Sequence, residues 1–220
     1  MNYDSVPLRD FKELNDWETV IFVYQSALKQ VETKIDILNG EFQHRHKYNP
    51  IEHVKSRIKT PESIVKKLKR HGYESSIENM VRYVNDIAGI RISCSFTSDI
   101  YLIADMISKQ NDLTILARRD YMKNPKKSGY RSYHMLVTTP VFLSDSIIDT
   151  KVEIQIRTVA QDFWATLEHK MHYKFEGDGP DYITKELREC ARYVAELDTR
   201  MEELLSLIHI SEPTRPISIS

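Results

Sequence analysis

The residues most suggestive of chemistry lie in a seven-residue run, 152–158. Its apolar and polar residues alternate, so on a strand the side chains of Glu153, Gln155 and Arg157 share the face opposite the core. An acid, an amide and an arginine in one row suit a site that handles phosphates and a metal ion. The solvated face of an edge strand would give the same alternation. Other residues must decide between these two interpretations.

A second candidate segment is the loop 123–134, in which lysines, aromatic residues and a glycine come together. Lys126 and Lys127 could contact phosphates, and His134 ends the segment. The ring of Tyr130 beside these cations could stack on a base, a contact worth roughly 1 to 3 kcal/mol. A tyrosine in a turn more commonly serves packing, so the loop alone does not define a nucleotide site.

A third group surrounds the start of an expected helix at 60–70, which opens with a threonine cap and a proline. Ser63 and Lys67 lie one turn apart on one face of this helix, and Arg57 and Lys59 precede it. Because a helix N-terminus attracts anions, the group favours a phosphate site. A solvated amphipathic face explains the same spacing equally well.

Two acids could complete such a site. Asp86 stands five residues before Arg91, at the start of a β-rich segment, and Glu153 lies on the strand described above. Pyrophosphoryl transfer needs a divalent ion, carboxylates to hold it, cations and a base near the attacking hydroxyl. No Walker-type glycine loop, G-x-G-x-x-G motif or His-Asp dyad occurs, so P-loop, Rossmann and His-Asp phosphohydrolase chemistry are not supported. Strand order is not visible in a sequence, so the two acids cannot be brought together at this point.

The composition of the 220 residues is that of one substantial α/β domain, with 41% hydrophobic residues. A formal net charge of −1 does not support a general nucleic-acid coat. No apolar stretch approaches the roughly twenty residues that span a bilayer, and no signal-peptide core occurs, so we expect a cytoplasmic protein. Cys94 and Cys190 are isolated, which argues against a disulfide framework and a zinc site.

The elements that must position these residues follow from the spacing of apolar side chains. Helices are predicted over 17–42, 60–70, 75–84, 98–110, 164–173 and 181–207. Strands are predicted over 51–58, 86–96, 113–118, 133–139 and 151–158. The expected fold class is α+β, with a mixed sheet of four to five strands flanked by helices and long N- and C-terminal helices. Residues 206–220 are expected to be a vector-derived or disordered tail.

Five motifs, in order, resemble the synthetase domain of the RelA/SpoT homologue family, and within it the synthetase-only small alarmone synthetases of the RelP kind. They are Arg57-Ile58-Lys59, Asp86-Ile87-Ala88-Gly89-Ile90-Arg91, Gly129-Tyr130-Arg131-Ser132-Tyr133-His134, Glu153-Ile154-Gln155-Ile156-Arg157-Thr158 and Phe163-Trp164-Ala165-Thr166-Leu167-Glu168-His169. The resemblance implies a single nucleotidyltransferase-like (p)ppGpp synthetase domain over 17–205. It also implies transfer of the β,γ-pyrophosphoryl group of ATP to the 3′-hydroxyl of GDP or GTP, giving alarmone and AMP.

The resemblance also implies roles for individual residues. Asp86 and Glu153 would bind Mg²⁺, and Glu153 would also activate the 3′-hydroxyl. Arg57 and Arg91 would sandwich adenine, which suits the flat guanidinium group. The ATP phosphates would be met by Lys59, Ser63 and Lys67. Tyr130 would stack on guanine. The acceptor side would be lined by Lys126, Lys127, His134, Gln155 and Arg157.

The family further implies a homotetramer, while the hydrolase and regulatory domains of its larger members do not fit within this length. In a sister subgroup, of the RelQ kind, an asparagine stands at the position of Asp162 and a phenylalanine at that of His53, where alarmone binds between subunits. This departure puts feedback activation in question. Two alternatives stay open: a non-catalytic sensor of guanine nucleotides or RNA on the same fold, and a pyrophosphokinase with another acceptor.

Overall fold

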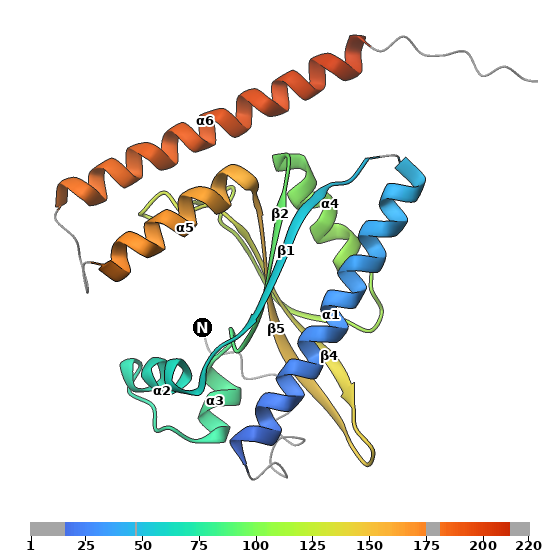
Figure 1. Cartoon of the computed structure of the whole chain (residues 1–220), viewed down its shortest axis with the longest axis vertical. Helices are drawn as coiled ribbons and strands as arrows, with labels where there is room; N and C mark the ends of the chain where they lie inside the picture. Colours follow the sequence, from blue (N-terminus) through green and yellow to red (C-terminus); the bar gives the residue numbers. More distant parts are fainter. Residues whose placement is uncertain (1–15, 47, 175–180, 212–220) are drawn as a thin grey trace, which may run out of the picture.

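The computed structural model describes residues 16–46, 48–174 and 181–211 (Figure 1). Its helices are α1 (Trp17–His46), α2 (Pro61–Arg70), α3 (Ile77–Tyr83), α4 (Thr97–Ser108), α5 (Val159–Lys174) and α6 (Asp181–Ser211). Its strands are β1 (Ile51–Ile58), β2 (Ala88–Cys94), β3 (Thr114–Asp120), β4 (Tyr133–Phe142) and β5 (Ile147–Thr158). In the described part of the chain no helix is long and apolar enough to cross a membrane.

The five strands form one sheet in the order β1-β2-β5-β4-β3. Strands β2 and β5 are parallel, and the other neighbours are antiparallel, so the sheet is mixed and the predicted α+β fold is confirmed. Because β5 is the central strand, the interpretation of its polar face as the solvated face of an edge strand is wrong. The polar face of a central strand is available for a site.

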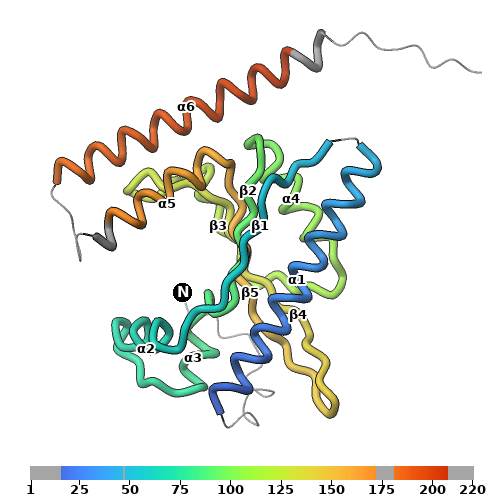
Figure 2. The backbone as a smooth tube through the Cα atoms, in the orientation of Figure 1, coloured from blue at the N-terminus to red at the C-terminus, as the bar shows by residue number. Residues whose placement is uncertain are grey.

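The two faces of the sheet differ in character. Ile90, Ile92, Ile154 and Ile156 are fully buried on one face, in a core cluster to which α1 and α4 also contribute. Figures 1 and 2 show α1 and α4 on one side of the sheet, and α2 and α5 on the other, near opposite ends. The face opposite α1 therefore stays open between α2 and α5.

On that open face the strand register aligns polar side chains in rows. One row crosses all five strands through the paired positions Lys55, Arg91, Gln155, His134 and Arg119. In the next row Arg57 pairs with Gly89, and Gly89 pairs with Glu153. Partners in a register point to the same face, so the rows assemble the candidate residues from β1, β2, β4 and β5.

The structure differs from the predicted elements mainly at their ends. Strand β5 begins at Ile147, because its pairing with β4 continues to the end of the hairpin. Helix α5 begins at Val159, directly after β5, where the Thr158 hydroxyl accepts a hydrogen bond from the amide of Gln161 at 3.2 Å. Helix α6 continues to Ser211, so 206–211, assigned above to a tail, are helical. Residues 212–220 of that segment lie outside the described residues.

Candidate active site

Asp86 and Glu153 line one cavity on the open face of the sheet, although they are 67 residues apart in the sequence. The other lining residues are Lys55, Ser56, Arg57, Gly89, Ile90, Arg91 and Gln155. The parallel pairing of β2 with β5 brings the acids together, because Gly89, three residues after Asp86, lies beside Glu153. Both carboxylates that the sequence predicted as metal ligands thus belong to one site.

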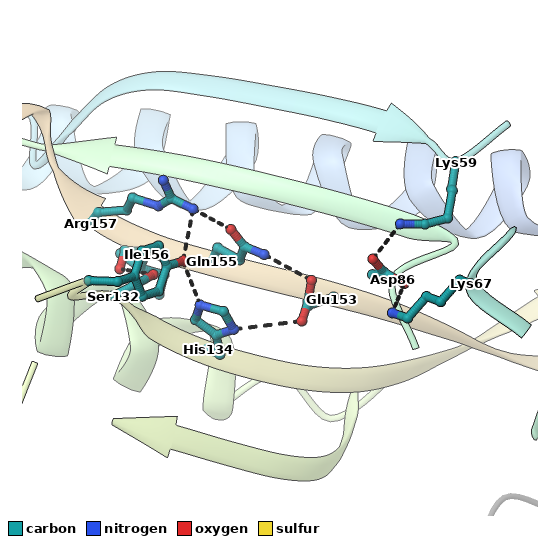
Figure 3. Close-up of polar contacts among 10 residues, drawn as sticks. Lys59, Lys67, Asp86, Ser132, His134, Glu153, Gln155, Ile156 and Arg157 are labelled. Atoms are coloured by element: carbon teal, nitrogen blue, oxygen red, sulfur yellow. Dashed lines mark hydrogen bonds and ion pairs between the residues drawn. The ribbon is translucent and has the colours of Figure 1, made fainter. Parts of the chain in front are cut away.

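Asp86 is held by two lysines, Lys59 and Lys67, which belong to the group predicted around the start of α2. The Lys59 ammonium lies 2.6 Å from Oδ2 and the Lys67 ammonium 2.7 Å from Oδ1 (Figure 3). Burial acts to raise the pKa of Asp86, but the hydrogen bonds from the two lysines outweigh it and hold the pKa below its usual range. Asp86 is therefore ionised at neutral pH. Its lysine partners are the pair predicted to meet phosphates.

Ser63 lies in the first turn of α2, as predicted. The Thr60 side chain caps this helix by accepting a hydrogen bond from the Ser63 amide at 3.3 Å. The Ser63 side chain is exposed and does not line the cavity with Asp86. The structure therefore places Ser63 near the site by its helix rather than by direct contact.

Glu153 belongs to a ring of five polar side chains, which four hydrogen bonds and one longer contact between His134 and Glu153 close. Gln155 Nε2 donates a hydrogen bond to Glu153 Oε2 at 2.9 Å, and the Gln155 carbonyl oxygen accepts one from Arg157 Nη2 (Figure 3). The same Arg157 nitrogen donates to the Tyr130 hydroxyl at 2.9 Å. The Tyr130 hydroxyl lies 2.9 Å from His134 Nε2, and His134 Nδ1 lies 3.6 Å from Glu153 Oε1. Both carboxylate oxygens of Glu153 are thus contacted by other residues of the ring, Oε2 by Gln155 and Oε1 by His134.

The ring has a consistent direction of hydrogen bonding. Burial lowers the pKa of His134, so its imidazole is neutral at pH 7. Burial also raises the pKa of Tyr130, so its phenol keeps its proton. Because the Glu153 carboxylate that faces His134 Nδ1 can only accept a hydrogen bond, Nδ1 is the protonated nitrogen of the neutral ring and Nε2 accepts from the Tyr130 hydroxyl. Two series of donor-to-acceptor contacts therefore run from Arg157 to Glu153, one through Gln155 and the other through Tyr130 and His134.

The protonation state of Glu153 follows from this arrangement. Burial acts to raise the pKa of Glu153, but the contacts of the carboxylate with His134 and Gln155 outweigh burial and hold the pKa below the usual range. Since His134 is neutral, we attribute the lowering to the polar contacts of His134 Nδ1 and Gln155 Nε2 with the carboxylate more than to a histidine charge. The site therefore holds two ionised carboxylates at neutral pH.

Tyr130 is engaged on several sides in this structure. The Lys126 ammonium lies 4.7 Å and the Arg157 guanidinium 5.2 Å from its ring centroid. The ring is also partly buried against Trp164 and Ala191. Two cations therefore already lie against the ring that was predicted to stack on a base. Lys127 is exposed on the same loop.

Two charged residues near the site were not among the predicted catalytic and substrate-binding residues. Asp162, only 8% exposed, lies 3.3 Å from an Arg91 nitrogen and 3.4 Å from an Arg157 nitrogen, and so links the arginine predicted to contact ATP with the one predicted to line the acceptor side. Lys151, 2% exposed, donates to Asn85 Oδ1 at 2.7 Å and to the Arg82 carbonyl at 3.3 Å. The sequence carried a signal for Lys151, since it shares the period-two face of Glu153, but none for the double contact of Asp162.

This arrangement, a mixed sheet with paired carboxylates, lysines and arginines on its open face, defines a nucleotide-handling site, and comparison with known proteins identifies its family. Residues 56–178, more than half of the chain, match the family described as a region found in RelA/SpoT proteins. The chain belongs to this family. It is 46% identical over 188 residues to the GTP pyrophosphokinase YwaC of Bacillus subtilis strain 168, covering 86% of this chain and 90% of that protein.

Solved structures of relatives have the same fold. The crystal structure of small alarmone synthetase 2 from Bacillus subtilis aligns with a TM-score of 0.79 at 44% identity, covering 86% of this chain and 99% of that one. The structure of small alarmone synthetase 1 from the same organism, bound to its product pppGpp, aligns with a TM-score of 0.82 at 33% identity, covering 89% and 98%. The expected resemblance to small alarmone synthetases is confirmed.

Proposed function

We propose that this protein is a (p)ppGpp synthetase, which transfers the pyrophosphoryl group of ATP to the 3′-hydroxyl of GDP or GTP and releases AMP. Membership of the RelA/SpoT family and the relatives named GTP pyrophosphokinase support this activity. The observation that carries the proposal is the shared cavity of Asp86 and Glu153, flanked by Arg57 and Arg91. Such a cavity offers the carboxylates and cations that transfer between two polyanions requires.

ATP is proposed to bind over β1, β2 and α2. Arg57 and Arg91 hold the adenine between planar guanidinium groups, since both line the cavity from neighbouring strands. Lys59, Ser63 and Lys67 bind the phosphates, which also face the N-terminus of α2. Lys59 and Lys67 exchange their contacts with the carboxylate of Asp86 for phosphate oxygens, which frees Asp86 to hold a metal ion.

Mg²⁺ is the proposed cofactor, held by Asp86 and Glu153. Both carboxylates are ionised at neutral pH, and carboxylate oxygens are ligands that Mg²⁺ prefers. Within residues 16–46, 48–174 and 181–211 no group of three or more His, Cys, Asp or Glu could hold a metal ion alone. Asp86 and Glu153 would therefore hold the ion together with nucleotide phosphates and water, as is usual for Mg²⁺ in phosphoryl-transfer enzymes. A bound ion would supply positive charge that neutralises the phosphates.

The acceptor nucleotide is proposed to bind against the loop 121–132 and the ring of Glu153. Tyr130 stacks on guanine once Lys126 leaves its ring, and the phosphates of the acceptor meet Lys126 and Lys127. The rest of the acceptor contacts His134, Gln155 and Arg157. Because the ring of hydrogen bonds fixes Glu153, a bound 3′-hydroxyl meets a carboxylate whose orientation is set in advance.

The reaction then follows from this placement. The 3′-hydroxyl oxygen attacks the β-phosphorus of ATP, and its proton passes to a carboxylate oxygen of Glu153. The new oxygen–phosphorus bond forms as the bond from the β-phosphorus to the α,β-bridging oxygen breaks. AMP leaves with that oxygen, and the product carries the pyrophosphate on its 3′ position.

The test is to incubate the protein with Mg²⁺, ATP and GDP and to separate the nucleotides by anion exchange. AMP and alarmone should form in equal amounts as GDP disappears. Glu153→Gln should lower kcat by about 100-fold or more, the usual contribution of a general base, while exposed Glu186→Gln should not. Normal turnover by Glu153→Gln would refute the role of Glu153. Guanine-nucleotide or RNA binding without product by the unchanged protein would select the non-catalytic sensor instead.

The domain and assembly are also proposals. Residues 17–205 are proposed to form a single synthetase domain. This is supported by a core cluster that extends from α1 to β5 and by a smaller cluster through which α5 and α6 pack against Tyr130. A homotetramer is proposed because exposed apolar side chains lie on two long helices. These are Phe22 and Ile37 on α1, and Tyr193, Leu197, Met201 and Leu204 on α6. Light scattering should give four times the 25.8 kDa of one chain, and a monomer mass would refute this assembly. The cytoplasmic location stays a prediction of the sequence.

A further inference from the structure

The loop that carries Tyr130 lies directly against helix α6. Gly129 has a φ of +92°, in the left-handed region that favours glycine. A Cβ atom built on Gly129 would lie 2.5 Å from the Cβ of Ala191 on α6, closer than real Cβ contacts allow. The main chain of the loop thus packs onto Ala191 with no space between them. We call residues 121–132 the acceptor loop.

Helix α6 is fastened on both sides of Ala191. One turn before it, the Leu187 carbonyl accepts a hydrogen bond from Trp164 Nε1 at 2.9 Å. Two turns after it, Asp198 Oδ2 accepts bonds from the Thr158 hydroxyl at 2.9 Å and from Gln161 Nε2 at 2.6 Å. Figures 1 and 2 show α6 lying along α5, which carries Trp164 and Gln161. Ala191 is therefore held in place between two anchors.

The acceptor loop is held between α6 and the ring of Glu153. Tyr130, the residue after Gly129, packs against Trp164, Ala165 and Ala191, while its hydroxyl bonds to His134 and Arg157. The surface of α6 at Ala191 thus limits how far the loop can retreat from the catalytic ring. The donor-side elements β1 and β2 lie on the other side of β5 in the sheet order.

We infer that Ala191 is a positioning residue for the acceptor nucleotide, because its small side chain sets the distance between the acceptor loop and α6. This inference rests on the function proposed above. A larger side chain at this position has to push Gly129 away, and Tyr130 moves with it. A misplacement of about 1 Å in a substrate-positioning group can lower a rate about 100-fold. The effect falls on the acceptor, since the loop does not contribute to the ATP side.

The experiment compares Ala191→Val with Ala195→Val, and the KM values for GDP and for ATP are measured separately. Ala195 lies one turn further along α6 and is partly exposed in a groove that Gly129 and Ala191 also line. None of its atoms is among those nearest to a Cβ on Gly129, so the same two added methyl groups find space there. Ala191→Val should raise the KM for GDP by about tenfold or more and change the KM for ATP by less than twofold. Ala195→Val should match the unchanged protein in both values.

A reciprocal pair of substitutions tests the contact itself. Gly129→Ala alone should raise the KM for GDP, through its positive φ and its collision with Ala191. Adding Ala191→Gly removes one of the two colliding Cβ atoms, so the double variant should recover part of the loss. Recovery is specific to a contact between these two positions, and a general loss of stability at either position would not produce it.

The outcomes separate this inference from the proposed function. If the unchanged protein forms neither AMP nor alarmone, the proposed function fails. If it is active, a KM for GDP within twofold of the unchanged value in Ala191→Val overturns the inference, as does an equal rise for both substrates. Thermal melting accompanies each assay, and should Ala191→Val melt below the assay temperature, Ala191→Ser decides by the same criterion.

Discussion

Lys151 offers a sharp test of the electrostatics under the active site. The residue is 2% exposed, and its ammonium has two neutral hydrogen-bond partners, the Asn85 side chain and the Arg82 carbonyl. Burial lowers its pKa from the ordinary 10.5 to about 8, with a smaller contribution from the nearby charge of Lys67. Replacing it by methionine keeps a long side chain in the same space and removes the charge.

The magnitude follows from this lowered pKa. The folded protein releases the Lys151 proton near pH 8, and the unfolded chain releases it near 10.5. Below pH 8 the buried charge therefore destabilises the fold by about 3 kcal/mol. Between these values the unfolded chain binds more protons, so the stability rises with pH. Relative to Lys151→Met, the unchanged protein should gain about 2 kcal/mol between pH 7 and pH 9.5.

Urea denaturation at these two pH values measures the difference. At pH 7 the variant loses two hydrogen bonds from a charged donor but also loses the burial penalty, so the two proteins should differ by no more than about 2 kcal/mol. Lys170→Met, which removes an exposed lysine of α5, is the control and should keep the pH dependence of the unchanged protein. The reasoning is refuted if Lys151→Met shows the same change in stability with pH as the unchanged protein.

Three other predictions follow from the site. Gln155→Leu removes one hydrogen bond to Glu153 and should lower kcat about tenfold, consistent with a loss of about 1.4 kcal/mol, with little change in the KM for ATP. An unchanged kcat in steady-state kinetics would contradict the role of the ring in orienting Glu153. Asp162→Asn removes the carboxylate shared by Arg91 and Arg157, so the KM values for ATP and GDP should both rise several-fold, and a rise for only one substrate would contradict its linking role. Chelation by EDTA should abolish turnover without changing the melting temperature, because the proposed metal site needs nucleotide phosphates to be complete; a large drop in melting temperature would indicate a structural metal ion.

Local features of the site were predictable from the sequence. Period-two alternation placed Glu153, Gln155 and Arg157 on one face of a strand, and the structure joins all three in one ring. The Thr60 cap and the one-turn spacing predicted a helix that carries Ser63 and Lys67, and the structure has this helix, with Lys67 in contact with Asp86. These features depend on a few neighbouring residues, which is why pattern alone was sufficient.

Features that depend on distant pairing were not predictable. The proximity of Asp86 and Glu153 requires β2 and β5 to be parallel neighbours, and no local pattern specifies that pairing. The contacts of Tyr130 with Lys126 and Arg157 arise only after the acceptor loop packs on α5 and α6. The position of Asp162 between two arginines likewise depends on where α5 begins. Only the resemblance to a family predicted that Asp86 and Glu153 belong to one metal site, because the spacing of residues in the sequence does not specify which strands are neighbours.

Gly89 has a consequence for the shape of the reaction path. It lies between Arg57 and Glu153 in the register, and the position that a Cβ atom would take has no other atom within 4 Å. The floor of the cavity between Arg57, proposed to bind adenine, and Glu153, proposed to act as the base, is therefore main chain without a side chain. A nucleotide can therefore lie flat against the main chain at Gly89. A methyl group at residue 89 would project into the cavity between Arg57 and Glu153 and would obstruct a nucleotide that spans both residues.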